Sequence, residues 1–255
     1  RVHVGHVVGD EDDPTARKTL EAPVVDLEEG PGHRRKAAVH DLAQETGRAE
    51  FMPDALPPEF QWLRTPDSAR LFSLDARPGA LRLFGREAPG SLFEHALVAR
   101  RQTDVAYAAE TEIDYAPETC QQFAGLVAWY NGFKFHYLAV TAGDAGQRQL
   151  TVMSCPADWP MMRMEQPLAA PIDLPATGRV RLGCDVDGMT LRFRFAIEGG
   201  DWTDLGLALD QSAISDEAGN GPGNNFTGAF IGMAAHDTSG RGLHADFLHF
   251  QYEPR

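Results

Sequence analysis

Two dipeptides that favour tight turns constrain the fold of this chain most. Asn131-Gly132 and Asp187-Gly188 each separate two short runs rich in apolar residues. Both dipeptides favour the two-residue loops of β-hairpins, because Asn, Asp and Gly tolerate the positive φ that such loops require. The sequence therefore predicts at least two antiparallel hairpins.

Alternation of side chains predicts which face of a strand is buried. After the second turn, Leu191, Phe193 and Phe195 alternate with arginines. Successive side chains of a strand point to opposite faces, so these three apolar residues share one face. We expect a half-buried strand with this face turned inward.

The last strand-like run, 244–252, divides into two faces by the same rule. One face is expected to hold Ala245 and Phe247, and the other to hold Phe250 and Tyr252. The two pairs are thus expected on opposite faces of the strand.

From about residue 51 onward, short apolar runs alternate with Gly, Pro, Asn and Asp at intervals of roughly 8–12 residues, an interval typical of all-β sandwiches. No stretch of this region keeps the spacing of an amphipathic helix over 12 residues or more. We therefore predict an all-β domain, an antiparallel two-sheet β-sandwich, over 51–255.

Residues 1–50 differ from the rest of the chain. They contain an acidic run at 10–13, a basic run at 34–36, and few apolar residues without a sustained period. We expect this segment to be an irregular or disordered linker and to precede the sandwich domain.

Charge and composition exclude several classes of function. The chain of 255 residues has 37 acidic and 23 basic residues and a formal net charge of −14, which disfavours nucleic acid as a partner. No run approaches the roughly 20 apolar residues of a membrane-spanning helix, so we expect no membrane contact. A neutral ligand such as a sugar is compatible with this charge.

The three cysteines, Cys120, Cys155 and Cys184, are too few and too dispersed for a disulfide framework or a zinc site. We expect buried thiols in a reducing compartment. The sequence shows no secretory signal, which favours a cytoplasmic location.

A calcium ligand could come from Asp185, Asp187, Asp237 or Asp246, but their spacing does not resemble a dedicated calcium loop, so we predict no metal site. We also expect no cofactor.

One strand carries a pair of carboxylates with the spacing of glycosidase residues. Glu112 and Asp114 lie two positions apart, which is about 6.6–7 Å along a strand. Glycosidases use two carboxylates roughly 5–9.5 Å apart. Pro117 then interrupts the strand before Glu118. We favour a solvated polar strand face, and the alternative is an independent sandwich glycosidase that uses Glu112 and Asp114.

Aromatic residues raise the alternative of a free-standing carbohydrate-binding module. Such a module needs exposed rings on a concave face, because the apolar faces of sugars stack on aromatic rings. Most of the rings are expected in the core, and periodicity does not reveal which is exposed. The candidates are Trp62, Trp129, Tyr130, Phe133, Phe135, Tyr137, Trp159 and Trp202.

Six blocks, in order, resemble the C-terminal concanavalin A-like domain of family 43 glycoside hydrolases, the β-xylosidases. These blocks are 56–66, 81–87, 93–102, 123–131, 226–232 and 237–247. The resemblance covers about 51–255 and implies a concanavalin A-like jelly-roll sandwich.

The resemblance also implies how such a domain takes part in catalysis. In that family an N-terminal five-bladed propeller supplies an Asp general base, a second Asp that orients the substrate and a Glu general acid. Residues 1–50 do not resemble that propeller, so no catalytic residue is expected here. The implied role is that of an accessory domain that closes the propeller's pocket around a xylo-oligosaccharide or related sugar. The family also implies a homo-oligomer.

The resemblance implies one substrate-binding residue, Phe226. In the family a sandwich loop places a Phe beside the bound sugar, and Phe226 stands at the matching position, just before Thr-Gly-Ala-Phe. It follows the Gly- and Asn-rich stretch 219–225, and functional side chains are frequent at such loops. The alternative is an ordinary core Phe at the start of a strand.

Overall fold

The computed structural model describes residues 47–53, 55–156, 163–218 and 227–255, all within one compact unit. The predicted N-terminal segment lies outside the described residues as far as residue 46, so its irregularity stays a prediction. Its last four residues form the first strand. No helix among the described residues is long and apolar enough to cross a membrane.

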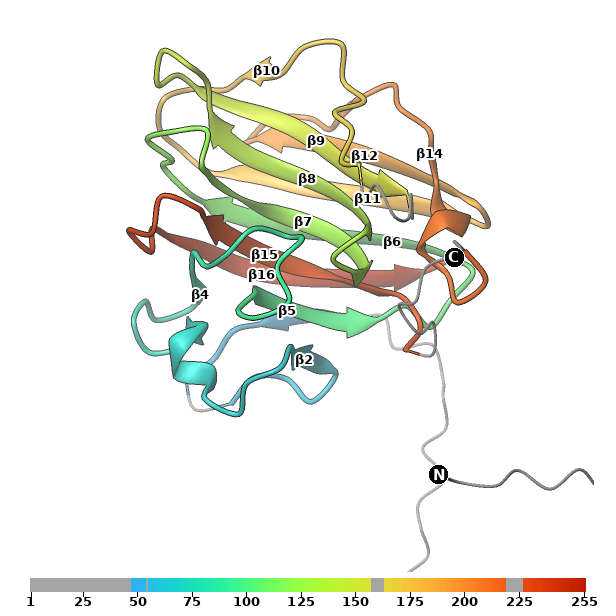
Figure 1. Ribbon diagram of the computed structural model, residues 1–255, viewed down its shortest axis with the longest axis horizontal. Helices are drawn as coiled ribbons and strands as arrows, with labels where there is room; N and C mark the ends of the chain where they lie inside the picture. The colour runs from blue at the N-terminus through green and yellow to red at the C-terminus, as the bar shows by residue number, and fades with distance from the viewer. Residues whose placement is uncertain (1–46, 54, 157–162, 219–226) are drawn as a thin grey trace, which may run out of the picture. The chain divides into compact units, whose positions relative to one another are not determined.

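The predicted two-sheet antiparallel sandwich is confirmed (Figure 1). The first sheet has nine strands in the order β13-β12-β11-β6-β16-β4-β3, with β1 beside β16 and β14 beside β12. Their bounds are β1 Gly47–Glu50, β3 Phe72–Ser73, β4 Leu81–Phe84, β6 Ala106–Asp114, β11 Val180–Asp187, β12 Thr190–Ile197, β13 Thr203–Asp204, β14 Leu209–Asp210 and β16 His244–Pro254.

The second sheet has seven strands in the order β10-β9-β8-β7-β15-β5-β2. Their bounds are β2 Phe60–Trp62, β5 Ala96–Arg101, β7 Gln122–Asn131, β8 Lys134–Ala142, β9 Arg148–Pro156, β10 Ile172–Asp173 and β15 Phe230–Asp237. Two short 3₁₀ turns, η1 Ser68–Arg70 and η2 Gln211–Ile214, are the helical elements of the described residues.

Both predicted hairpins are present, as β7–β8 and β11–β12. Each loop lies one residue later than the dipeptide suggests, because Asn131 pairs with Lys134 and Asp187 pairs with Thr190. Asn131 stabilises its turn through Oδ1, which accepts a hydrogen bond from the N–H of Phe133 at 3.0 Å.

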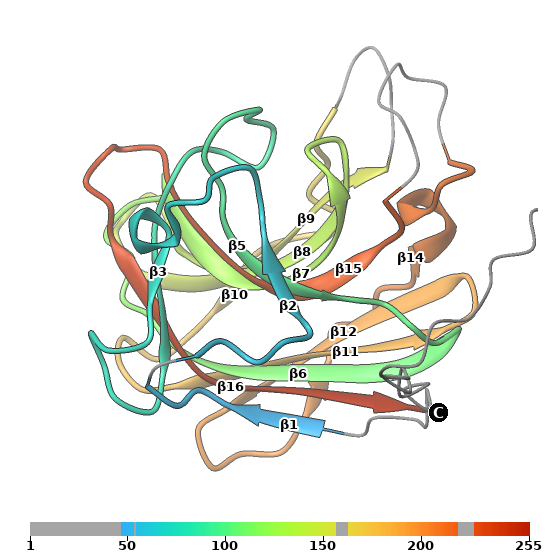
Figure 2. The ribbon, with the colours of Figure 1, turned by 90° about the horizontal axis from the view of Figure 1, so that it is seen from below.

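The main core lies between the two sheets, which form separate layers in Figure 2. Leu191, Phe193 and Phe195 are buried in it, as their alternation predicts. The prediction for 244–252 is wrong, because Ala245, Phe247, Phe250 and Tyr252 are all in this core.

A β-bulge explains the difference. The register of β16 against β6 shifts between Phe247 and His249. One extra residue moves every later side chain of the strand to the opposite face.

The seven-stranded sheet also buries apolar side chains on its outer face, which is concave in Figure 2. We call this surface the concave face. Its cluster comprises Leu97, Ala99, Val127, Trp129, Phe135, Tyr137, Ala139, Met153, Cys155 and Ala234.

Residues 85–95, between β4 and β5, pass over the concave face, and we call them the strap. The backbone N–H of Asp237 donates to the carbonyl of Arg86 at 2.7 Å. The rings of His95 and Trp129 meet edge to face at 5.3 Å. His236 contacts the carbonyl of Glu87 through Nδ1. The strap is therefore anchored to β15 and β7 and shields the middle of the concave face.

Candidate functional site

The described residues on either side of 219–226 are held together at the end of β7. The hydroxyl of Tyr130 donates a hydrogen bond to Oδ1 of Asp216. The backbone N–H of Gly228 donates to the same oxygen at 3.2 Å, and that of Thr227 donates to the Tyr130 hydroxyl at 3.2 Å. We call these four residues the Tyr130 clamp. It fixes the chain just before and just after 219–226 at one place.

Lys134 reinforces this clamp. Its Nζ lies 4.7 Å from the centre of the Tyr130 ring and donates to the carbonyl of Ser215 at 3.1 Å. Burial lowers the pKa of Lys134. Burial and the hydrogen bond to Asp216 raise the pKa of Tyr130. The phenol therefore stays protonated and remains a donor at neutral pH.

Arg101, at the end of β5, holds the first residues after 219–226. Its guanidinium donates to the carbonyl of Thr227 and lies 4.8 Å from the centre of the Phe230 ring. Gly228 has φ +70, and a Cβ there would lie 3.1 Å from Nη1 of Arg101. Glycine at this position therefore permits both the left-handed backbone and the approach of the arginine.

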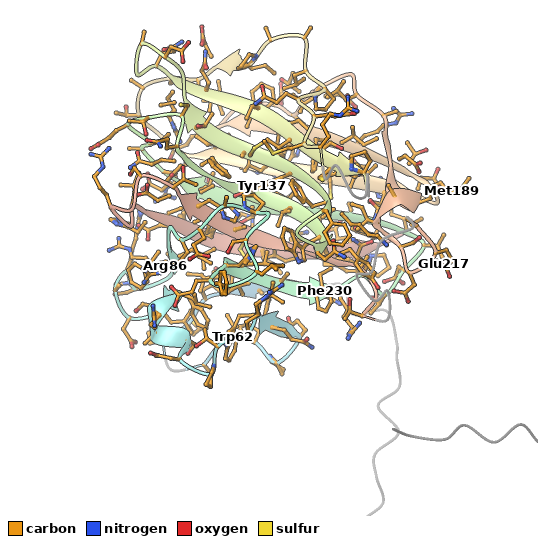
Figure 3. All side chains as sticks on the ribbon, viewed as in Figure 1. Trp62, Arg86, Tyr137, Met189, Glu217 and Phe230 are labelled. Carbon is orange, nitrogen blue, oxygen red and sulfur yellow. The ribbon has the colours of Figure 1, made fainter. Side chains whose placement is uncertain are left out.

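A cavity of about 330 Å³ lies beside the clamp. Its lining includes Trp62, Trp129 and Phe230, together with Thr227. Figure 3 shows Trp62 on β2 and Phe230 on β15. We call this space the Trp62 cavity. Three aromatic rings and a few polar groups are the usual lining of a small-molecule site.

Phe226 itself lies outside the described residues, so its assignment as the substrate-binding residue stays a prediction. Its neighbour Thr227 belongs to the clamp and lines the Trp62 cavity. The described residue that follows Phe226 in the sequence therefore lies at an aromatic cavity.

The two strand carboxylates lie on the other sheet. Glu112 is 3.5 Å from Nη1 of Arg179, and Asp114 is 2.8 Å from Nη1 of Arg77. Both project from the outer face of the nine-stranded sheet, opposite the buried side chains of β6. Each carboxylate is thus neutralised by an arginine, which is the arrangement of a polar strand face.

Further ion pairs lie on the same outer face, along β6 and β16, and we call the whole set the ion-pair ladder. Asp246 binds Arg82 at 2.7 Å and Arg77 at 2.8 Å. Burial alone would raise the pKa of Asp246, but hydrogen bonds from both arginines hold it below its usual value. Glu110 lies 3.7 Å from Nε2 of His249 and accepts a hydrogen bond from Arg181 at 2.8 Å, and these two neighbours lower its pKa to about 2. These carboxylates are therefore permanently charged at neutral pH and are unsuited to donate a proton.

Within the described ranges, no three His, Cys, Asp or Glu side chains gather closely enough to hold a metal ion. The three cysteines, all described, form no disulfide. The expectation of buried thiols is right for Cys155 and Cys184 and wrong for Cys120, which is exposed. Burial raises the pKa of Cys184 to about 12, so this thiol is inert.

The Tyr130 clamp is the part of the site that sequence reasoning missed. Tyr130 and Asp216 are 86 residues apart, and each is a common residue type in loops and strands. No local pattern connects them, because only the sheet order brings β7 beside β15.

Comparison of this chain with known proteins identifies its family. The family model described as the β-xylosidase C-terminal concanavalin A-like domain matches residues 48–253. A xylosidase/arabinosidase of Humicola insolens is 46% identical over 197 residues, which are 77% of this chain and 36% of that protein. A β-xylosidase of Bacillus subtilis is 36% identical over 207 residues, which are 81% of this chain and 38% of that protein.

A solved structure agrees with these matches. The crystal structure of a xylan β-1,4-xylosidase from Bacillus halodurans has a TM-score of 0.77 and is 32% identical, over 90% of this chain and 41% of that chain. The chain thus spans less than half the length of these relatives. Since the family model covers most of its residues, the chain belongs to the family of β-xylosidase C-terminal concanavalin A-like domains.

Proposed function

We propose that this domain completes the sugar pocket of a family 43 propeller catalytic domain. The segment that carries Phe226 would reach the mouth of the pocket and exclude water from the bound sugar. The propeller would supply the acid and the base for inverting hydrolysis at the non-reducing end of a xylo-oligosaccharide or related sugar.

Membership of the family supports this role. The relatives are named for xylosidase and arabinosidase activities, and their matched part is less than half of each protein. The whole reaction would then need the propeller, either in the same polypeptide or as a separate chain.

The observation that carries the proposal is the Tyr130 clamp. A loop that contacts a substrate must have its two ends fixed, because a side chain misplaced by about 1 Å can lower the rate about 100-fold. The clamp fixes both flanks of 219–226 through Asp216, Thr227 and Gly228. It thereby fixes the positions of the described residues on both sides of the segment.

An exposed apolar surface supports docking against a second domain. Leu92 and Phe93 on the strap are 64% and 74% exposed. Adjacent exposed apolar side chains of this size commonly mark an interaction surface. We propose that the strap packs against the propeller.

The test is an add-back assay with the catalytic domain of the Humicola insolens relative. Hydrolysis of 4-nitrophenyl β-D-xylopyranoside is measured for that domain alone, for this chain alone, and for the mixture. We expect little hydrolysis by either part and a clear gain in the mixture.

The matched variant for this assay is Tyr130→Phe, which keeps the ring and removes the hydroxyl of the clamp. It should restore less activity than the unaltered chain while the chain remains folded. A mixture no more active than the catalytic domain alone would contradict the proposal. Hydrolysis by the chain alone that is lost in Glu112→Gln would instead support the sandwich glycosidase.

We further propose that this chain by itself forms a homo-oligomer and that it is cytoplasmic. The exposed strap supports self-association of the domain when no propeller covers it. Light scattering of the purified chain should show a species larger than one chain, and Phe93→Asp should reduce its mass.

A further inference from the structure

A second hollow lies on the concave face, on the side of β8 and β9. It has a volume of about 810 Å³, within the usual range of ligand sites, and we call it the β9 groove. The strap forms one wall through Ala88, Pro89 and Gly90, and residues 164–171 contribute to the other.

The strap separates the β9 groove from the Trp62 cavity. It touches the β7–β8 hairpin so closely that a Cβ on Gly132 would lie 3.0 Å from the carbonyl oxygen of Pro89 and 3.3 Å from Cα of Gly90. Glycine at 132 therefore permits this contact. The β9 groove and the Trp62 cavity share no lining residue and are accordingly separate hollows.

The floor of the groove is apolar and contains a fixed aromatic ring. Phe123, Phe135 and Met153 lie on it. The ring of Phe123 is half-buried and meets the rings of Tyr137 at 6.1 Å and His236 at 5.1 Å. These neighbours hold the Phe123 ring in position, so a ligand would not have to order it.

The remainder of the lining is rich in neutral hydrogen-bonding groups. These residues are Thr141, Gln147, Gln149, Thr151, Gln166 and Thr238. Nε2 of Gln149 donates to Asp173 at 2.8 Å. The hydroxyl of Thr141 donates to the carbonyl of Gln122 at 2.9 Å. The two side chains are thus oriented by the fold, and their oxygens keep capacity to accept further hydrogen bonds.

Charge is almost absent from the β9 groove. Among its lining residues, only Asp144 carries a formal charge, although the chain as a whole has a net charge of −14. An anionic or cationic ligand would find no partner of opposite charge for most of the groove's length. A neutral ligand with apolar faces and many hydroxyls would match the ring, the amides and the threonines.

We infer that the β9 groove binds a stretch of neutral β-linked xylan chain or xylo-oligosaccharide. The sugar rings would lie on Phe123 and the apolar floor, and their hydroxyls would bond the amides of Gln147 and Gln149. This binding needs no propeller and would hold the polymer beside the catalytic domain.

The test is calorimetric titration of the purified chain with xylohexaose. Open grooves bind short sugars weakly, and we expect a dissociation constant on the order of 1 mM or tighter. Because the titration contains no catalytic domain, its failure would leave the proposed function intact, and failure of the add-back assay would leave this inference intact.

Two groove variants and one control make the test specific. Phe123→Leu keeps an apolar side chain and removes the ring, and Gln149→Ala removes a rim amide. Each should weaken binding about tenfold, and Gln251→Ala on the outer face of the nine-stranded sheet should change it less than twofold.

A third variant tests the rim without touching the core. A Cβ at position 143 would lie 2.4 Å from Nε2 of Gln147 and 2.6 Å from Oε1 of Gln149. Gly143→Ala should therefore displace both amides and weaken binding while thermal unfolding is unchanged. No measurable binding of xylohexaose by the unaltered chain, or equal binding by all folded variants, would overturn the inference.

Discussion

The two outer faces of the sandwich carry opposite kinds of side chain. The nine-stranded sheet presents a ladder of ion pairs, in which Asp114, Asp246 and Glu112 each contact an arginine. The concave face of the seven-stranded sheet presents aromatic rings, amides and hydroxyls beside two hollows. The outer face of the nine-stranded sheet thus carries more charged side chains, and its carboxylates are neutralised by neighbouring arginines.

This difference shows why carboxylate spacing alone misleads. Two strand carboxylates at glycosidase spacing occur on the face where each has an arginine partner. Among the described residues that line the two hollows of the concave face, no such pair occurs. A functional role for a side chain on this domain therefore depends on whether its neighbours already neutralise it.

The largest expected effect concerns the buried histidines of the concave face. Burial lowers the pKa of His236 to about 3, so its protonation favours the unfolded chain, in which the pKa is about 6.5. Its contribution to stability is present above pH 6.5 and is lost as pH falls. We expect the free energy of unfolding to fall by about 3 kcal/mol between pH 6.5 and pH 4.

Urea unfolding at several pH values checks this expectation. His236→Gln can still donate to the strap carbonyl but does not titrate, and it should flatten the pH dependence. On the other face, Asp246 and Glu110 have lowered pKa values, so the stability that they contribute is lost only below about pH 4. An unchanged slope between pH 6.5 and pH 4 in His236→Gln would contradict the account of the concave face.

A smaller effect is expected from the ion-pair ladder. Asp246→Ala removes the shared partner of Arg77 and Arg82. Both arginines are partly exposed, so water compensates part of the loss, and we expect about 2 kcal/mol of destabilisation. Asp201→Ala, an exposed control, should cost less than about 0.5 kcal/mol. Equal stability of the two variants in chemical unfolding would show that the ladder contributes nothing.

Phe226→Ala is expected to act on catalysis. In the assembly with the catalytic domain, it should lower kcat/KM about tenfold, equivalent to about 1.4 kcal/mol, because water would enter the pocket. Its thermal unfolding should match that of the unaltered chain. Kinetics identical to those of the unaltered assembly would remove Phe226 from the site.

The smallest effect is expected from Glu112→Gln. The ion pair with Arg179 is long, at 3.5 Å, and partly exposed. Such pairs contribute about 0–1 kcal/mol, so unfolding should change little and hydrolysis by the assembly not at all. A large loss of hydrolysis would mean that the ion-pair face is the catalytic one.

Much of the fold was predictable because it depends on local signals. The turn dipeptides and the alternation of Leu191, Phe193 and Phe195 need only neighbouring residues. The bulge before His249 was not predictable, because it depends on pairing with β6. One inserted residue reversed the predicted faces of the last strand.

The candidate site was predictable only in part. The resemblance pointed to Phe226, yet the Tyr130 clamp joins residues 86 positions apart. The β9 groove is lined by the strap and residues 164–171 as well as by β7, β8 and β9. The strap covers some of the aromatic rings of the concave face. Its contact with the β7–β8 hairpin joins two segments distant in the sequence, so no local sequence pattern predicts it. Tyr137 and Trp129 are buried beneath it, while Phe93 is exposed on it.

The measurement that tests the central claim most directly compares one variant from each region. Phe226→Ala and Glu112→Gln are assayed side by side for hydrolysis of 4-nitrophenyl β-D-xylopyranoside in the assembly with the catalytic domain. The account predicts that Phe226→Ala loses about tenfold in kcat/KM and that Glu112→Gln retains full activity. Loss of activity in Glu112→Gln with full activity in Phe226→Ala would contradict it.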